Sequence, residues 1–275
     1  MLYIMLHSYV ISIATATTRR EHVISEFSKH NINFSFYDAI TPSIELTKLI
    51  QSIAPNLNRV THMTDGEKSC LMSHIMLWKK CVDEEWPYIA IFEDDIWLGK
   101  QANTILNESK WLDDLFLLHK NFIIKIETTL QPCQVHTIDY KLPNSTHSLM
   151  KLCSDHYGGG GYILSRQAAA FLLKKIREME TENFIAVDGL LFDHLLASKN
   201  LSIFQLYPAI CIQEIIVRPE DVSLRSQLES DRKLKQNNKM NRNLRQKILR
   251  ELWRVNKQLY LFKYRKIPMN IVPFE

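Results

Sequence analysis

The chain has 275 residues, of which 46% are hydrophobic and 23% charged, and its formal net charge is +4. A compact chain of this length buries roughly three quarters of the surface that its unfolded form exposes, which excludes a mini-protein stapled by disulfides. The ordinary balance of apolar and charged residues also argues against wholesale disorder and against a polytopic membrane protein.

The first 14 residues are apolar but differ from an export signal. No basic residue precedes the apolar run, and the first two arginines, Arg19 and Arg20, follow it. No stretch reaches the roughly 18 consecutive apolar residues that a membrane-spanning helix needs. The five cysteines are widely spaced and form no C-x-x-C motif, which favours a reducing compartment. We therefore expect a cytoplasmic protein.

The first half of the chain alternates strand-like and helix-like segments. A T-x-x-E capping box at Thr18 predicts one helix, and a second box at Thr64 predicts a longer helix through Glu84. The proline in Thr41–Ser43 is typical of another helix start. The continuous apolar run Tyr88–Phe92 is typical of a buried parallel strand. Further expected strands are His7–Ile13, Ile32–Tyr37 and Phe122–Glu127, with a helix at Asn103–Leu118.

The second half continues this alternation after a turn-rich stretch, Gln131–Ser148. The glycine run Gly158–Gly161 leads into a short apolar strand, and Ser165 caps a helix that reaches about Met179. A further helix follows Asp188, and residues 201–212 return to strand character. Alternating strands and helices predict an α/β fold with a mostly parallel central sheet.

A basic segment lies near the end of the chain. Residues 225–266 carry 14 lysines and arginines against three acidic residues, whereas the rest of the chain carries 20 against 27. Apolar residues recur every three or four positions and predict a helix with one stripe, made of Leu244, Ile248, Leu252, Val255, Leu259 and Phe262. Such a helix can lie on an anionic membrane surface or pack its stripe on the body of the protein, and the two interpretations are compatible. No nucleic-acid-reading module accompanies the charge, so we expect no nucleic-acid partner.

Three consecutive carboxylates, Glu93, Asp94 and Asp95, follow the buried strand directly. Ligands bind at the carboxyl ends of the strands in open α/β sheets, and a divalent cation shared with a phosphate would neutralise the carboxylates there. Alternation of side chains places Glu93 and Asp95 on one side and Asp94 on the other, so the first two form the candidate metal site. The alternative is an exposed acidic turn.

Three other features have both a functional and a structural interpretation. The glycine run either lets the backbone approach a sugar or phosphate, with Tyr157 or Tyr162 as a stacking platform, or is a flexible turn. Asp188 is either a helix N-cap or a general base that faces the metal cleft. His74 is either a satisfied buried group or part of the site.

Taken in order, these segments resemble the bacterial glycosyltransferases of family 25, which include lipooligosaccharide galactosyltransferases. The motifs that carry the resemblance span about residues 8–200. They are V-I-S-I before an Arg-rich helix start, F-Y-D-A-I at 36–40, G-E-K-S-C-L-M-S-H at 66–74, Y-I-A-I-F-E-D-D-I at 88–96, G-G-G-G-Y-I-L-S-R-Q-A-A at 158–169, and V-D at 187–188.

The resemblance implies a GT-A-like fold that binds a nucleotide-sugar. It also implies an inverting transfer of a sugar, with galactose as the expected one, from a UDP-sugar to a lipooligosaccharide or lipopolysaccharide acceptor. It implies Mn²⁺ or Mg²⁺ at Glu93 and Asp95, although this motif begins with glutamate where the family's DxD-like motif has aspartate. Asp188 would be the general base that deprotonates the acceptor hydroxyl. The donor pocket would comprise Ser12, Arg20, Asp38, Ala39, Glu67, Ser73, His74, Asp94, Gly159, Gly160, Gly161 and Tyr162.

The same reasoning divides the chain into a GT-A-like domain, 1–217, and a basic helical extension, 218–275. The extension would hold the enzyme on the cytoplasmic face of the inner membrane, near a lipid-linked saccharide acceptor. Two alternatives stay open at this point. One is a metal-dependent nucleotidyltransferase that uses the same acidic cluster, and the other is a non-catalytic peripheral membrane protein.

Overall fold

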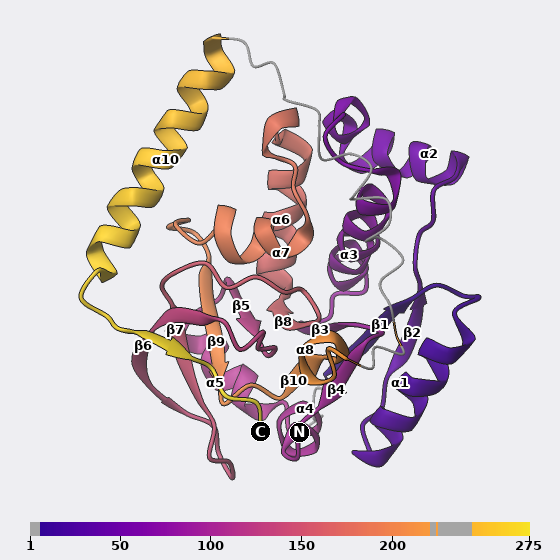
Figure 1. Ribbon diagram of the computed structural model, residues 1–275, viewed down its shortest axis with the longest axis vertical. Helices are drawn as coiled ribbons and strands as arrows, with labels where there is room; N and C mark the ends of the chain where they lie inside the picture. The colour runs from indigo at the N-terminus through magenta and orange to yellow at the C-terminus, as the bar shows by residue number, and fades with distance from the viewer. Residues whose placement is uncertain (1–5, 221–223, 225–243) are drawn as a thin grey trace.

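The computed structural model describes residues 6–220, 224 and 244–275, with only the backbone described for 244–250. These residues form a mixed α/β structure with helices on both faces of a central sheet (Figure 1). The strands are β1 (His7–Ser12), β2 (Ser35–Asp38), β3 (Tyr88–Glu93), β4 (Ile96–Leu98), β5 (Phe122–Lys125), β6 (Pro132–Lys141), β7 (Ser148–Leu152), β8 (Gly161–Ser165), β9 (Ser202–Tyr207), β10 (Cys211–Gln213) and β11 (Met269–Ile271).

The helices alternate with these strands along most of the described chain. The α-helices are α1 (Thr17–Lys29), α2 (Ile44–Ile53), α3 (Asp65–Asp83), α4 (Ala102–Asn107), α5 (Lys110–Leu118), α6 (Arg166–Glu178), α7 (Val187–Gly189), α8 (Glu214–Val217) and α10 (Leu244–Tyr264). Two 3-10 helices, η1 (Pro55–Arg59) and η2 (Thr181–Asn183), and one π-helical segment, η3 (Leu190–His194), complete the set.

The central sheet has nine strands in the order β11-β6-β7-β9-β5-β8-β3-β1-β2. β1 pairs in parallel with β2 and β3, and β5 pairs in parallel with β9. β8 runs antiparallel between β3 and β5, and β7, β6 and β11 continue the sheet beyond β9 in antiparallel pairs. Six of the nine strands therefore point the same way, which confirms the expected α/β class, although the pairing is mixed rather than uniformly parallel.

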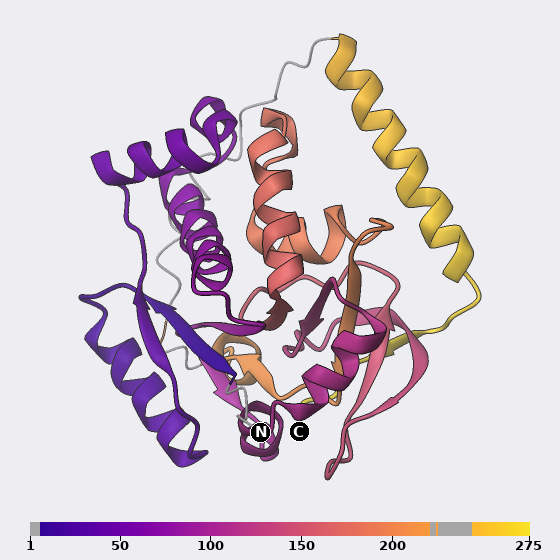
Figure 2. The ribbon, with the colours of Figure 1, turned by 180° about the vertical axis from the view of Figure 1, so that it is seen from behind.

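The hydrophobic core lies in two layers, one on each face of the sheet. In β3, Ile89 and Ile91 face a cluster that includes residues of α2, α3 and α6, whereas Ala90 and Phe92 face a cluster that includes residues of α1, α4 and α5. Successive side chains of a strand point to opposite faces, so a strand covered on both faces must be apolar throughout. Figure 2 shows α3 and α6 together above the sheet, with α1 at one side of the molecule.

Two of the three predicted helix caps are confirmed. The Thr64 hydroxyl accepts a hydrogen bond from the Glu67 backbone N–H (3.0 Å), and the Glu67 carboxylate accepts one from the Thr64 N–H (2.8 Å). Ser165 likewise accepts from the first turn of α6. The box at Thr18 is wrong, because α1 already begins at Thr17 and its N-cap, Ala16, has no side chain that can cap it.

Two other stretches differ from the expectation. The helix expected over 103–118 is divided into α4 and α5 at Glu108 and Ser109. The stretch expected to be rich in turns contains β6, which pairs with β7. Exposed and half-buried polar side chains fill most of β6, and the weak alternation that results conceals the strand in the sequence.

The basic helix, α10, is present and lies at the opposite end of the molecule from α1 (Figures 1 and 2). It packs on the body through Trp253, which stacks on His194 with ring centroids 5.0 Å apart, and through Tyr260, which donates to the Leu152 carbonyl (3.0 Å). The expected stripe is not the packed face. Its described members are exposed, at 60% for Leu252, 56% for Val255, 66% for Leu259 and 60% for Phe262.

The interpretation that this stripe packs on the body is therefore wrong for its described part, and the side chains of Leu244 and Ile248 lie outside the described residues. The packed residues Trp253 and Tyr260 are seven positions apart and form a second stripe with helical spacing, so periodicity alone does not identify the packed face. Across the described chain, we find no helix with the length and hydrophobicity that crossing a lipid bilayer requires.

Candidate active site

A cleft of about 260 Å³ opens where the carboxyl ends of β1 and β3 meet the N-terminal half of α3. This edge of an open α/β sheet is where ligands bind. Of the residues expected in the site, the cleft brings together Ser12, Ala39, Ser73, His74, Glu93, Asp94 and Asp95. Its other lining residues are Ile11, Ile13, Ala16, Arg19, Ile40, Thr41, Pro42, Gly66, Ser69 and Cys70.

The acidic segment presents its carboxylates in two directions. Gln213 Nε2 donates to Glu93 Oε2 (3.1 Å) and lies 3.4 Å from Asp95 Oδ1, so these two side chains converge as alternation predicts. Asp94 instead pairs with Arg19, whose guanidinium also lies 3.5 Å from Asp95 Oδ2. Asp94 and Asp95 thus share the guanidinium of Arg19.

Burial makes the charge of this segment costly. Burial and the neighbouring Glu93 carboxylate raise the pKa of Asp95 to about 7. Burial also disfavours ionisation of Glu93, but the neighbouring His74 and Arg19 side chains outweigh it and hold the pKa of Glu93 below its usual range. Glu93 therefore stays ionised, and a positive charge added beside Asp95 would stabilise its ionised form.

The donor set at this edge fits a hard divalent cation. Glu93 and Asp95 offer carboxylate oxygens, which Mg²⁺ and Mn²⁺ prefer as ligands, and the raised pKa of Asp95 marks negative charge that the protein leaves uncompensated. A second set, Cys70, His74 and Glu93, has one ligand atom from each residue within 4.8 Å of the others. A thiol and an imidazole suit a softer metal such as zinc.

Three buried polar atoms of the cleft have no hydrogen-bond partner among the described residues. They are Ser12 Oγ, Ser69 Oγ and His74 Nε2, in residues that are 2%, 3% and 0% exposed. An unpaired buried polar group costs about 1–3 kcal/mol, so a ligand that pairs with these atoms gains affinity. Apolar side chains such as Ile11 and Ile40 line the same cleft, which favours a ligand with an apolar face and a few polar edges.

The glycine run brings Asp188 close to the acidic segment. The Gly158 N–H donates to Asp188 Oδ2 (3.2 Å). A Cβ atom at Gly159 would lie 3.6 Å from Glu93 Oε1 and 3.7 Å from Asp188 Cβ, so Gly159 separates the two carboxyl side chains. Tyr157 directly precedes the run and is 43% exposed. Two carboxyl groups and an exposed aromatic ring thus lie around one glycine turn.

The rest of the run is buried and does not line the cleft: Gly161 begins β8, and Gly160 directly precedes it. The Gly160 N–H donates to the buried Glu127 carboxylate (2.9 Å). A Cβ atom at Gly161 would lie 2.3 Å from Cys211 Sγ, so only glycine fits between the strands there. Tyr162 is wholly buried and is not among the residues that line the cleft.

Three other expected donor residues shape the surroundings of the cleft rather than line it. Arg20 pairs with Asp38 and donates to the Ser12 carbonyl (3.1 Å), which ties the carboxyl ends of β1 and β2 together. The Ala39 N–H also donates to the Ser12 carbonyl (2.9 Å). Glu67 takes part in the capping box of α3.

Sequence reasoning missed a buried ion pair beside the site. Lys125 and Glu127 are both wholly buried with Nζ and Oε2 3.0 Å apart, and Lys125 also donates to the Gly158 carbonyl. Burial raises the pKa of Glu127, although the Lys125 ammonium opposes this effect. The signal in the sequence is K-I-E at the end of an apolar strand, because residues two apart lie on the same side of an extended chain.

The fold and the site together define an α/β protein with a ligand-binding cleft at the carboxyl edge of its sheet, lined by clustered carboxylates and unpaired hydroxyls. The model of one family, glycosyltransferase family 25 (LPS biosynthesis protein), matches residues 5–191. The chain belongs to this family, as its motifs indicated.

Curated relatives extend the match over nearly the whole chain. The lipooligosaccharide biosynthesis protein lic2B of Haemophilus influenzae is 40% identical, covering 97% of this chain and 98% of its own length. Two lacto-N-neotetraose biosynthesis glycosyltransferases of Neisseria meningitidis serogroup B follow. LgtE is 36% identical over 82% of each chain, and LgtB is 32% identical over 98% of this chain and 100% of its own.

Proposed function

We propose that this chain transfers galactose, with inversion, from a UDP-sugar to a saccharide of lipooligosaccharide or lipopolysaccharide. The observation that carries the proposal is the cleft in which the Glu93–Asp95 carboxylates lie with the unpaired hydroxyls of Ser12 and Ser69. The uncharged polar atoms of a nucleoside can form hydrogen bonds with such hydroxyls, and a diphosphate can bind a cation that the carboxylates hold. The printed names of the relatives support lipooligosaccharide as the acceptor class.

Glu93 and Asp95 are the residues that would hold Mn²⁺ or Mg²⁺, and the ion would stabilise the negative charge on the departing diphosphate. Arg19 lies beside both Asp94 and Asp95, where its guanidinium can also contact a phosphate. Ser12 and Ser69 face the nucleoside, with Ala39 and Ile40 as part of the apolar wall. Each of these residues binds and orients the donor.

Asp188 is the proposed general base. Only the glycine turn at Gly159 separates Asp188 from Glu93, which would place a sugar held beside Glu93 near Asp188. A carboxylate on the opposite side of the sugar from the leaving group accepts the proton of the acceptor hydroxyl, and attack from that side inverts the anomeric centre. Tyr157, half exposed beside Asp188, is the proposed platform on which the acceptor saccharide stacks.

The test measures UDP release from a panel of UDP-sugars with truncated lipooligosaccharide, in Mn²⁺ and in EDTA. We expect metal-dependent release with UDP-galactose and a product of inverted anomeric configuration by NMR. Asp188→Asn lowers the turnover by about 10²–10⁴-fold, the usual contribution of a general base. Asp65→Asn, at an exposed position of α3, is the matched control and leaves turnover unchanged.

Each other outcome points to a different enzyme or to none. Pyrophosphate in place of UDP would indicate a nucleotidyltransferase, and release with another UDP-sugar alone would correct the donor. Donor binding without any release, with every acceptor of the panel, would indicate a protein that binds but does not transfer. Full activity of Asp188→Asn would remove Asp188 from the mechanism and leave the transferase assignment in place.

We also propose that the exposed face of α10 rests on an anionic membrane on the cytoplasmic side, where a lipid-linked acceptor would be available. Leu252, Val255, Leu259 and Phe262 form an exposed apolar stripe, and Arg254, Lys263, Arg265 and Lys266 are exposed around it. Apolar side chains that enter the headgroup region, together with basic side chains that pair with anionic lipids, are typical of interfacial helices.

Co-sedimentation with vesicles of phosphatidylcholine, with and without phosphatidylglycerol, tests this surface. The double variant Leu259→Ser, Phe262→Ser should lose binding to anionic vesicles, and high salt should weaken binding by the wild type. Ile44→Ser is the matched control, because Ile44 is 78% exposed on α2, outside the stripe. Equal binding by the double variant and the control would show that the stripe is not the membrane contact.

A further inference from the structure

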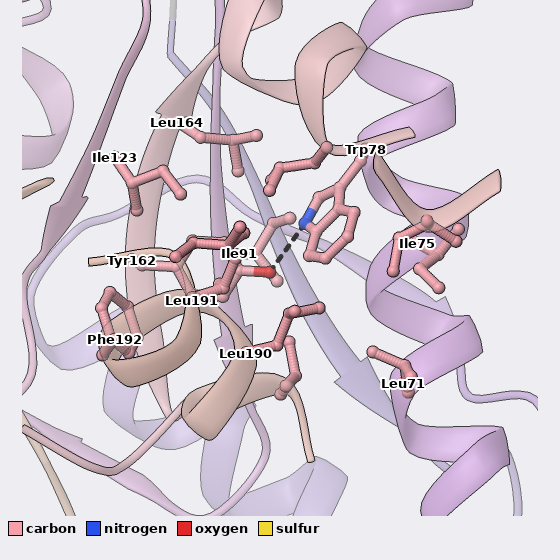
Figure 3. Close-up of a cluster of buried hydrophobic side chains, with 14 of the residues drawn as sticks. Leu71, Ile75, Trp78, Ile91, Ile123, Tyr162, Leu164, Leu190, Leu191 and Phe192 are labelled. Carbon is pink, nitrogen blue, oxygen red and sulfur yellow. Dashed lines mark hydrogen bonds between the residues drawn. The ribbon is translucent and has the colours of Figure 1, made fainter. Parts of the chain in front are cut away.

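A chain of buried hydrogen bonds runs from the interior to the acidic segment. It begins at Trp78 on α3, whose indole Nε1 lies 2.9 Å from the hydroxyl oxygen of Tyr162 on β8. Both side chains are wholly buried, and Figure 3 shows the pair at the centre of an apolar cluster with Ile91, Leu164 and Leu190. An indole N–H can only donate, so the tyrosine oxygen is the acceptor in this bond.

The tyrosine hydroxyl still has its own proton to donate. Among the described residues, its other partner is His74 Nδ1, 2.8 Å away. If Nδ1 carried a proton, the buried tyrosine O–H would have no acceptor, which costs about 1–3 kcal/mol. The Trp78 and Tyr162 pair therefore stabilises the tautomer of His74 in which Nδ1 accepts and Nε2 carries the hydrogen.

The Nε2–H of His74 points toward the acidic segment. Nε2 is buried without a hydrogen-bond partner in the described structure and lies 3.6 Å from Glu93 Oε1. This distance is longer than a hydrogen bond, and bonds at such sites often shorten only when the ligand is present. On its other oxygen, Glu93 already accepts from Gln213. Two donors thus define where the Glu93 carboxylate can lie.

We propose that His74 is a positioning residue that holds the Glu93 carboxylate through its Nε2–H, and that Tyr162 and Trp78 set the tautomer this requires. The inference rests on the proposed function, in which Glu93 helps to hold the cation. It gives Tyr162 a role in the site without any contact with the donor. It also assigns His74 a role other than metal binding, because a ring nitrogen that carries hydrogen has no lone pair for a metal. The set of Cys70, His74 and Glu93 is then not a metal centre.

The first test reads the tautomer directly and needs neither metal nor sugar. In ¹⁵N-histidine-labelled protein, two-bond ¹H–¹⁵N spectra distinguish the two neutral tautomers, and the His74→Gln variant identifies the His74 signals among the ten histidines. We expect the Nε2–H form in the wild type and a shift toward the other form or a mixture in Tyr162→Phe. Tyr88→Phe is the matched control, since the buried Tyr88 hydroxyl bonds Asp113, outside the cleft. A wild type in the Nδ1–H form overturns the inference, whatever the enzyme transfers.

The second test measures Mn²⁺ affinity by electron paramagnetic resonance in the absence of donor. Loss of a residue that orients a metal ligand typically weakens metal binding about 10–100-fold, and we expect a change of this order for Tyr162→Phe and for His74→Leu. His74→Gln should recover part of the affinity, because its amide can donate toward Glu93. Cys70→Ser and Tyr88→Phe should match the wild type.

These outcomes separate the inference from the proposed function. Unchanged Mn²⁺ affinity in both Tyr162→Phe and His74→Leu overturns the positioning role, even when the enzyme transfers galactose as proposed. Weakened binding in Cys70→Ser, together with His74→Gln no better than His74→Leu, overturns it in favour of direct ligation. If Tyr162→Phe does not fold, the two His74 variants decide the question alone.

Discussion

Two groups of charged residues lie at the ends of β5 and β3, the two strands that flank β8, and they differ in how their charge is balanced. At the end of β5, Lys125 and Glu127 form a wholly buried pair. The Gly158 carbonyl accepts from Lys125 and the Gly160 N–H donates to Glu127 Oε2, whereas Glu127 Oε1 has no hydrogen-bond partner among the described residues. At the end of β3, the three carboxylates of the acidic segment Glu93–Asp95 face the Arg19 guanidinium, the amide of Gln213 and the imidazole of His74.

The pair at β5 supports the fold, whereas the acidic segment at β3 is the proposed ligand site. The pair at β5 matches one cation to one anion and holds the backbone of the glycine run through Gly158 and Gly160. The segment at β3 has excess negative charge, which appears in the raised pKa of Asp95. Strongly perturbed pKa values cluster at functional sites, so the excess charge supports the proposed cation at the β3 end.

The largest effect is expected from breaking the balanced pair. Lys125→Met leaves Glu127 as an unpaired buried carboxylate and should lower the free energy of unfolding by about 3–5 kcal/mol, measured by urea denaturation. Lys48→Met is the control, because the Lys48 side chain is 69% exposed and lies 4.0 Å from Glu45. The control should change stability by less than about 1 kcal/mol.

Replacing both partners completes this test. Lys125→Met with Glu127→Leu removes both charges together and should recover part of the loss, since no charge is then left unpaired. A single variant Lys125→Met as stable as the Lys48 control would show that the buried pair does not support the fold.

At the acidic segment, removal of a charge should have the opposite sign. Asp95 holds its proton more tightly in the folded chain than in the unfolded one, so wild-type stability falls as the pH rises from about 4 through about 7. Asp95→Asn lacks this loss. Without metal, the variant should therefore unfold at a higher temperature than the wild type at pH 8, and the difference should fade toward pH 4.

Added Mn²⁺ tests the same charge from the other direction. The ion should raise the unfolding temperature of the wild type more than that of Asp95→Asn, because a ligand stabilises the state that binds it. If Asp95→Asn is less stable than the wild type at pH 8 in EDTA, the prediction that ionised Asp95 destabilises the fold is wrong.

Adjacent glycines connect the two groups and should respond differently to alanine. Gly158 has a φ of +103°, and a Cβ atom there would lie 2.9 Å from both oxygens of Glu127, so Gly158→Ala should destabilise the fold by about 1–3 kcal/mol. A Cβ atom at Gly159 would be 3.2 Å from Val187 and would occupy the space between Glu93 and Asp188. Gly159→Ala should lower the turnover strongly and change the free energy of unfolding little. Calorimetry measures the stability and UDP release measures the turnover. A Gly159→Ala variant that is destabilised but keeps its turnover would place the sugar elsewhere.

The sequence was sufficient for features that depend on neighbours along the chain. The cap at Ser165 and the capping box at Thr64 involve residues three positions apart, and the buried strand Tyr88–Phe92 is a continuous apolar run. The acidic segment follows that strand directly, so its place at the carboxyl edge of the sheet was predictable from the strand alone.

Features that depend on distant residues were not predictable in this way. Gln213 reaches Glu93 across 120 positions, and the glycine run is held by a strand more than 30 positions earlier. In α10 two stripes have helical spacing, and the one that packs is decided by partners such as His194 and Leu152, which local periodicity does not reveal. The strand β6 has too many exposed polar residues for its alternation to be read.

The smallest expected effect separates two T-x-x-E motifs that look alike in the sequence. Thr64 caps α3, the helix that presents Ser73 and His74 to the cleft. Thr64→Ala should lower the free energy of unfolding by about 1 kcal/mol, because the first turn of α3 loses the partner of one N–H group. Thr18 lies inside α1, where alanine is a favourable residue, so Thr18→Ala should change stability by less than about 0.5 kcal/mol.

Neither variant removes a charge, so the pH dependence due to Asp95 should persist in both. Urea denaturation at pH 5 and pH 8 measures both quantities, and a Thr64 variant without that dependence would show that the first turn of α3, rather than Asp95, is its source.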